Sequence, residues 1–212
     1  MRFLQSLKWK LERYHIRNLM MYLCLGMAGV FVLDVLFGSG ASGLLRFDKT
    51  KILHGQIWRL VTFLIVPPSG GLISVALHLY FYYFLGSLLE QQWSSASFNL
   101  YYLLGFIGCV VSGLLFGGAT NEFLNLSLVL AFALSYPEQQ FLLFFIVPVK
   151  ARWFGILTGV MLIWEVLTCS WTIKPCILFS LIPFVIFFGQ TAWTQVKLDI
   201  RRVKNLINGR RY

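Results

Sequence analysis

The 212-residue chain is 58% hydrophobic and 17% aromatic, only 12% of its residues are charged, and its mean hydropathy is +0.74. A soluble domain carries about twice that charged fraction, so this composition excludes a soluble globular fold. A chain embedded in lipid must pair its backbone polar groups internally, and long apolar runs without alternation favour helices over a barrel. The net charge of +10 makes the placement of the basic residues a second source of information.

The first 18 residues form a basic, amphipathic segment. Apolar side chains recur in it at spacings of three and four residues, and basic side chains surround them. This pattern predicts a helix that lies on an anionic membrane surface. The apolar face consists of Phe3, Leu7, Leu11 and Tyr14, and the surrounding basic residues are Lys8, Lys10, Arg13 and Arg17.

The first membrane-spanning helix is predicted over residues 19–37, where an apolar run ends in a turn rich in glycine and serine. A long first loop, residues 38–71, follows it. The apolar part of this loop, residues 52–66, would measure about 22 Å as a helix, which is too short to cross a bilayer. Pro67 and Pro68 end this part, so we expect an interfacial or re-entrant element there.

Five further apolar segments bring the predicted number of spans to six, in an all-α membrane domain over residues 19–193. A polar turn over residues 91–97 joins the second span to the third, and Pro137 makes the fourth span short. A strand-like or interfacial stretch, residues 141–149, precedes the fifth, and a basic amphipathic helix over residues 194–212 closes the chain. The five spans are predicted over residues 72–89, 98–116, 123–136, 153–169 and 175–193.

The basic residues are distributed unevenly between the two sides of this arrangement. One side holds 13 lysines and arginines: five in the N-terminal segment, two near residue 150 and six in the closing helix. The other side holds five, which are Arg46, Lys49, Lys51, Arg59 and Lys174. Because basic loops remain preferentially in the cytoplasm, we expect both termini there. A bacterial plasma membrane is the expected location, and an endoplasmic-reticulum membrane is the alternative.

Three stretches resemble the rhomboid superfamily of membrane proteins. Leu79–Trp93 (LYFYYFLGSLLEQQW) resembles the second rhomboid helix, with its Gly-x-x-Leu-Glu ending. Gly55–Thr62 (GQIWRLVT) resembles the Trp-Arg segment of the rhomboid first loop, a feature shared with the Derlin branch. Phe132–Trp153 resembles the end of the fourth helix and the link into the fifth. The resemblance implies a rhomboid-like bundle of six helices with a long first loop.

The same resemblance bears on catalysis. Rhomboid proteases attack with a serine in Gly-x-Ser-Gly at the start of the fourth helix, and a histidine in the sixth helix activates it. A serine hydroxyl is a weak nucleophile until a positioned base takes its proton. In this chain the serine position falls near Glu122, and the sixth span contains no histidine. The resemblance therefore implies a pseudoprotease, with no catalytic residues.

A literal Gly-x-Ser-Gly sequence does occur at residues 40–43, with Ser42 as its serine. It lies in the turn after the first span, where glycines serve the backbone conformation. Its base would have to be His54 or His78, and neither is at the family's position. If the chain were a protease with a relocated nucleophile, Ser42 and Ser127 would be the candidates.

Trp58 and Arg59 form the most specific family-like pair. They fit an aromatic-belt residue and an arginine that reaches lipid phosphate, as at any membrane interface. They also fit an anchor that fixes the first loop against the bundle. For Glu90, at the end of the second span, the resemblance implies a structural hydrogen-bonding role. The other positions that match the family are Gln56, Gly86 and Trp93.

Ionisable residues inside apolar spans are costly, which makes Asp34 and Glu165 functional candidates alongside Glu90. Asp34 lies near the outer end of its span, and Glu165 is the deepest acid by position. No chain of facing ionisable groups is apparent, so structural hydrogen bonding is favoured over transport. His78, without a second ligand, predicts a hydrogen-bonded core histidine rather than a metal site. We expect neither a metal nor another cofactor.

Small residues line one face of the third span, which permits close helix packing. This face serves either the internal bundle or a homodimer. The cysteines show no metal-like spacing and are interpreted as buried thiols, with a contact between Cys169 and Cys176 as the alternative. The small residues are Gly105, Gly108, Cys109, Ser112 and Gly113, and the other cysteine is Cys24.

The expected function is non-catalytic: the chain binds membrane-protein clients or their transmembrane helices, as Derlins do in membrane-protein quality control. The sixth span lacks the glycine-x-x-x-glycine motif of the Derlin sixth helix. The alternatives are a rhomboid-type intramembrane serine protease and a small transporter or channel. The basic ends are expected to contact anionic lipid headgroups rather than nucleic acid, because the closing helix also carries an apolar face.

Overall fold

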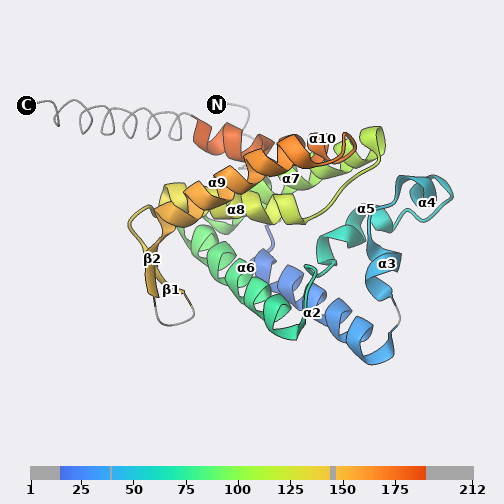
Figure 1. The fold of residues 1–212 in the computed structure, drawn as a ribbon, viewed down its shortest axis with the longest axis horizontal. Coiled ribbons are helices and arrows are strands. Elements are labelled where there is room, and N and C mark those ends of the chain that lie inside the picture. Colours follow the sequence, from blue (N-terminus) through green and yellow to red (C-terminus); the bar gives the residue numbers. More distant parts are fainter. Residues whose placement is uncertain (1–14, 39, 144–146, 190–212) are drawn as a thin grey trace, which may run out of the picture.

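The structure is a computed structural model that describes residues 15–38, 40–143 and 147–189. Figure 1 shows that this part of the chain is helical apart from one short β-hairpin. Most of the predicted N-terminal amphipathic segment, residues 1–14, lies outside the described residues. The predicted closing helix over residues 194–212 lies outside them as well.

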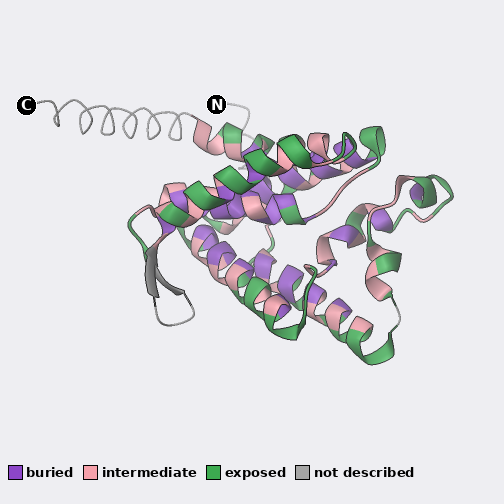
Figure 2. Cartoon of the chain, in the orientation of Figure 1, coloured by how far each residue is buried: buried purple, intermediate pink, exposed green. Residues whose placement is uncertain are grey.

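Four helices are long and apolar enough to cross a membrane. They are α2 (Leu19–Phe37), α6 (Leu72–Trp93), α7 (Ser95–Phe116) and α9 (Ala151–Thr168). Large apolar residues on them are exposed, such as Ile73 (78%) and Trp164 (68%), and Figure 2 colours several stretches of α6 and α9 as exposed. Exposed apolar surfaces of this extent are typical of helices that contact lipid. The chain therefore fits an integral membrane protein, as its composition predicts.

Two further apolar helical segments occupy the places predicted for the fourth and sixth spans. The first is α8 (Glu122–Ser135), which has 14 residues. The second is Lys174–Gly189, which begins with α10 (Lys174–Ser180). A helix of the length of α8 measures about 21 Å, whereas the hydrocarbon core of a bilayer is about 30 Å thick. The arrangement with six spans therefore stays a prediction.

The turn between the second and third predicted spans is shorter than the sequence indicates. We expected a polar turn over residues 91–97, but α6 continues to Trp93 and α7 starts at Ser95. The reversal takes place at Ser94 alone, whose φ is +75°. Gln91 and Gln92 are good helix formers and extend α6 beyond its apolar part.

The first loop consists of short helical pieces. They are α3 (Ala41–Leu45), α4 (Lys49–Leu53), α5 (Arg59–Thr62) and the 3₁₀ turn η1 (Phe63–Ile65). Asp48 caps α4 by accepting a hydrogen bond from the Lys51 N–H (3.2 Å), and this bond lowers the pKa of the Asp48 carboxyl. The loop thus has an ordered local structure, although its depth in a membrane stays a prediction.

The strand-like stretch around residue 145 is confirmed as a hairpin. Strands β1 (Gln140–Leu143) and β2 (Val147–Lys150) pair antiparallel, with Gln140 opposite Lys150. At its base, Glu138 accepts hydrogen bonds from Lys150 Nζ (2.7 Å) and from Arg152. The hydrogen bond from Lys150, together with the charge of Arg152, lowers the pKa of Glu138.

Helix α8 is the centre of the bundle. It packs against α6, α7, α9 and α10, while α2 packs on α6 (Figure 1). Most of its side chains are buried, including Leu124 and Leu128, and it is the most continuously buried helix in Figure 2. The first half of α8 therefore lies inside the protein, beside the first loop and α6.

The small face of α7 packs inside the chain, which favours the internal alternative over a homodimer. A Cβ placed on Gly108 would lie 2.6 Å from the backbone oxygen of Phe179, and one on Gly105 would lie 2.2 Å from Leu124. Glycine is required at such approaches because no other residue leaves room. Cys109 and Ser112 on the same face are fully buried. All four cysteines are free thiols, and Cys169 alone is only half-buried.

Candidate ligand-binding cavity

Arg59 holds the first loop together from inside. Its side chain is 1% exposed. Nη1 donates to the backbone oxygens of Gly43 (2.9 Å) and Arg46 (2.8 Å), and Nε donates to Gln56 Oε1 (2.7 Å). A buried guanidinium is tolerated only when its donors are satisfied in this way. Arg59 therefore acts as an anchor within the loop and does not reach for lipid phosphate, whereas Trp58 is 52% exposed and suits an interface.

The family-like residues of α6 connect it to its neighbours. Glu90 is buried and accepts a hydrogen bond from the Asn18 N–H (2.8 Å), just before α2 begins. A Cβ on Gly86 would lie 2.5 Å from Met20 Cγ, so α2 and α6 approach closely there. Trp93 packs on Tyr101, with ring centroids 5.4 Å apart. These contacts connect α6 to α2 and α7.

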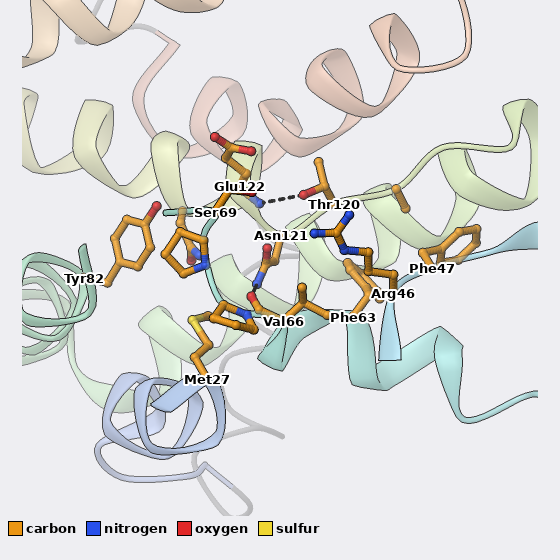
Figure 3. A pocket seen from close by; sticks show the side chains of 14 residues that line it. Met27, Arg46, Phe47, Phe63, Val66, Ser69, Tyr82, Thr120, Asn121 and Glu122 are labelled. Carbon is orange, nitrogen blue, oxygen red and sulfur yellow. Dashed lines mark hydrogen bonds between the residues drawn. The ribbon is translucent and has the colours of Figure 1, made fainter. Parts of the chain in front are cut away.

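A cavity of about 260 Å³ lies where the first loop, α2, α6 and the start of α8 meet (Figure 3). Its wall is part apolar and part polar. The lining residues are Met27, Arg46, Phe47, Phe63, Val66, Pro67, Pro68, Ser69, Tyr82, Ala119, Thr120, Asn121, Glu122 and Asn125. Glu122, near which the sequence resemblance implies the serine position, is therefore part of the cavity wall.

Asparagines at the start of α8 order the polar wall. Asn121 Nδ2 donates to the backbone oxygens of Leu64 (2.8 Å) and Val66 (2.9 Å), which ties the first loop to α8. Asn125 is 1% exposed, and its Oδ1 accepts a hydrogen bond from the Tyr102 hydroxyl (3.4 Å). These asparagines thus tie the polar wall to the first loop and to α7.

Two side chains of opposite charge line the cavity. Arg46 comes from the first loop and Glu122 from the first turn of α8. The Glu122 N–H donates to Thr120 Oγ1 (3.3 Å), the dashed line in Figure 3. Within residues 15–38, 40–143 and 147–189, the guanidinium of Arg46 and the carboxylate of Glu122 make no hydrogen bond or salt bridge.

Ser42 is bonded to an acid. Its hydroxyl donates to Asp34, and its backbone N–H lies 3.2 Å and 3.3 Å from the two carboxylate oxygens. Gly40, at φ +58°, is the N-cap residue of α3. The Gly-x-Ser-Gly sequence therefore forms the first turn of this helix, and Asp34 accepts the hydrogen bonds of its serine. The Nδ1 atom of His54 lies 2.6 Å from the backbone oxygen of Thr50, in its own helix turn.

Ser127 is fully buried in the centre of α8. Its hydroxyl donates to the Leu124 backbone oxygen (2.6 Å) and accepts from the Tyr101 hydroxyl (3.0 Å). In the described part of the chain, no histidine hydrogen-bonds to Ser127 or Ser42.

The structure corrects the prediction for His78. The side chain is hydrogen-bonded, with Nδ1 2.7 Å from the Ser74 backbone oxygen, but it is exposed and not in the core. The reason is that little packs on the N-terminal half of α6, where Leu72 and Ile73 are also exposed. Glu165, half-buried on α9, and His78 are titratable neighbours of Glu122. The described residues contain no group of three metal-ligating side chains.

Sequence reasoning identified Glu122 but missed the rest of the cavity. Arg46, Asn121 and Asn125 were not singled out, although Asn121 stands next to Glu122 at the start of an unusually short apolar helix. Two adjacent polar residues at the start of a short apolar helix could have indicated a polar site at the N-terminal end of α8. No family model matches the chain, and no curated protein matches it either.

Proposed function

We propose that this chain is a catalytically inactive, rhomboid-like membrane protein that binds the transmembrane segments of client membrane proteins, in the manner of a quality-control factor. The observation that carries the proposal is the cavity at the start of α8. It is polar, it lies among apolar helices, and its wall holds Asn121 and Glu122 where the resemblance implies a catalytic serine. Such a site can bind a polar group of a client helix, and it has no serine at this position to attack a peptide bond.

The short length of α8 supports a cavity at membrane depth. A helix of 14 residues whose far end lies at one membrane surface starts inside the hydrocarbon layer. Polar groups at that depth are tolerated only where they line a cavity or meet a partner. A client helix with a polar residue in its span would find hydrogen-bonding partners there that lipid does not provide.

The sides of α6 and α9 offer a surface for such a client. The two helices contact each other through Phe81 and Phe154, whose ring centroids are 5.7 Å apart. Away from that contact both expose apolar side chains, with Leu77 44% and Met161 56% exposed. His78 and Glu165 add polar groups near Glu122. This combination suits an apolar helix that carries an occasional polar side chain.

Purified, detergent-folded protein is expected not to react with a fluorophosphonate probe. The physical reason is that neither Ser42 nor Ser127 has a histidine partner, and the Ser127 hydroxyl is fully buried. The measurement is in-gel fluorescence, with Ser42→Ala and Ser127→Ala variants beside the unmodified chain. Labelling that disappears in one of these variants would show that the chain is a protease.

Client retention is expected to fall several-fold in Asn121→Ala. This variant loses the two hydrogen bonds to Leu64 and Val66 that hold the first loop at the cavity. The assay co-purifies a tagged single-span leucine segment with one central asparagine. Asn99→Ala is the matched control, since Asn99 Nδ2 also donates to a backbone oxygen, that of Ile16 (3.1 Å), but does not line the cavity. Equal retention in the two variants would contradict a role of the cavity.

A further inference from the structure

The cavity presents a positive and a negative side chain that are not paired with each other. Arg46 and Glu122 line the same space (Figure 3), and the described residues supply no hydrogen bond or salt bridge to either charged group. Both residues are exposed, so their charged groups are accessible to a ligand that enters this space. A ligand that carries both an anionic and a cationic group satisfies both at once, whereas a simple anion or cation leaves one of them unsatisfied.

A buried neutral donor lies in the same wall. Asn125 is 1% exposed, and its Oδ1 is used by the Tyr102 hydroxyl. Its amide nitrogen has no hydrogen-bond partner in the part of the chain that the structure describes. This nitrogen can therefore donate to a ligand acceptor in the cavity that Asn125 lines. Together with Arg46, it gives the cavity two kinds of donor for an anionic group.

The rest of the wall indicates that the ligand also has an apolar part. Met27, Phe47, Phe63 and Val66 line the same cavity as the polar groups. Helix α6, which borders it, also exposes the apolar side chain of Leu77, which suits an acyl chain. The most abundant amphiphile in a membrane that joins an anion, a cation and apolar chains is a zwitterionic phospholipid.

We propose that this cavity binds the headgroup of an aminophospholipid such as phosphatidylethanolamine, with its phosphate at Arg46 and its ammonium at Glu122. A primary ammonium has three N–H donors for the Glu122 carboxylate, whereas the quaternary ammonium of phosphatidylcholine has none. Glu122 therefore selects the amine, and Arg46 binds the phosphate common to both lipids. The inference needs only the cavity and does not rest on client binding.

The test measures lipid binding to the full chain by native mass spectrometry and by thermal shift in detergent. Short-chain phosphatidylethanolamine, phosphatidylcholine and phosphatidylglycerol are titrated separately, and soluble phosphoethanolamine is titrated as a fourth arm. We expect phosphatidylethanolamine to bind about tenfold more tightly than phosphatidylcholine, the difference that charge-assisted hydrogen bonds supply. Phosphoethanolamine should bind far more weakly, because it lacks the apolar chains.

Two variants test the roles of the two charged side chains in lipid binding, and a third is the control. Glu122→Gln is expected to bind the ethanolamine and choline lipids equally, and Arg46→Gln to bind both about tenfold more weakly while keeping the preference. Glu138→Gln, at the base of the hairpin, is the matched control and should change neither affinity. Melting temperatures without lipid show whether each variant is folded.

Several outcomes would overturn the proposal. Equal binding of the two zwitterionic lipids by the unmodified chain would by itself remove the role of the ammonium. Tighter binding of phosphatidylglycerol would assign the cavity to anionic lipids. Equal binding of soluble phosphoethanolamine would assign it to a soluble zwitterion, and a preference that survives Glu122→Gln would place the ammonium elsewhere.

Discussion

Replacing Arg59 with alanine is expected to lower the free energy of unfolding by about 3 kcal/mol, because charged hydrogen bonds are lost and buried carbonyl groups are left unsatisfied. Arg59 is 1% exposed and makes three hydrogen bonds inside the first loop. The loss should separate the segments that carry Gly43, Arg46 and Gln56. Reversible unfolding in mixed micelles, followed by tryptophan fluorescence, measures the change.

Two variants of the first loop control this result. Lys51→Ala removes an exposed basic residue whose ion pair with Asp48 spans 3.7 Å, and it should change stability little. Arg59→Lys keeps the charge but not the planar set of donors, so an intermediate loss is expected. If Arg59→Ala unfolded like the unmodified chain, the guanidinium would contribute only as an interfacial charge.

Gly108→Ala is expected to cost about 2 kcal/mol, as other cases of overpacking do. The added Cβ would lie 2.6 Å from the backbone oxygen of Phe179, and a backbone atom cannot rotate aside as the end of a side chain can. The segment that contains Phe179 must therefore move away from α7. The same unfolding experiment measures the effect.

Gly29→Ala is the matched control for Gly108→Ala. Gly29 also lies within an apolar helix, α2, but a Cβ there meets nothing within 4 Å. Alanine in a helix is more favourable than glycine by roughly 0.5–1 kcal/mol, so this variant should be as stable as the unmodified chain or slightly more stable. Equal effects of the two substitutions would mean that α7 and α10 are not in close contact.

The long helices could be predicted because hydropathy and length are local properties of the sequence. The first span, residues 19–37, coincides with α2, and the short fourth span was evident from Pro137. The exact turn at Ser94 could not be predicted, since helix propensity beyond the apolar run decided where α6 ends. The exposure of His78 was also missed, because it depends on which helices pack against α6.

The site was harder to predict than the helices. Arg59 and Glu90 were found because both belong to stretches with a family-like sequence, but their hydrogen-bond partners were not predicted. The cavity depends on contacts between residues far apart in the chain, such as Asn121 with Leu64. No periodicity or spacing within a single segment encodes such a contact.

The central claim is that a client helix lies beside α6 and α9 next to the cavity, and site-specific photocrosslinking tests it most directly. A photoreactive residue is introduced at His78 or Met161, and for comparison at Tyr80 or Ile163. In each pair the two positions are two residues apart, about 200° around the helix. All four are exposed, so lipid access does not distinguish them.

A tagged client segment is expected to crosslink at His78 and Met161, which are nearer to Glu122 and Glu165. Crosslinking at Tyr80 and Ile163 should be weak. Membranes with the client expressed at low level provide the sample, and the crosslinked product is identified by immunoblot. Equal crosslinking at all four positions, or none at any, would contradict client binding at this surface.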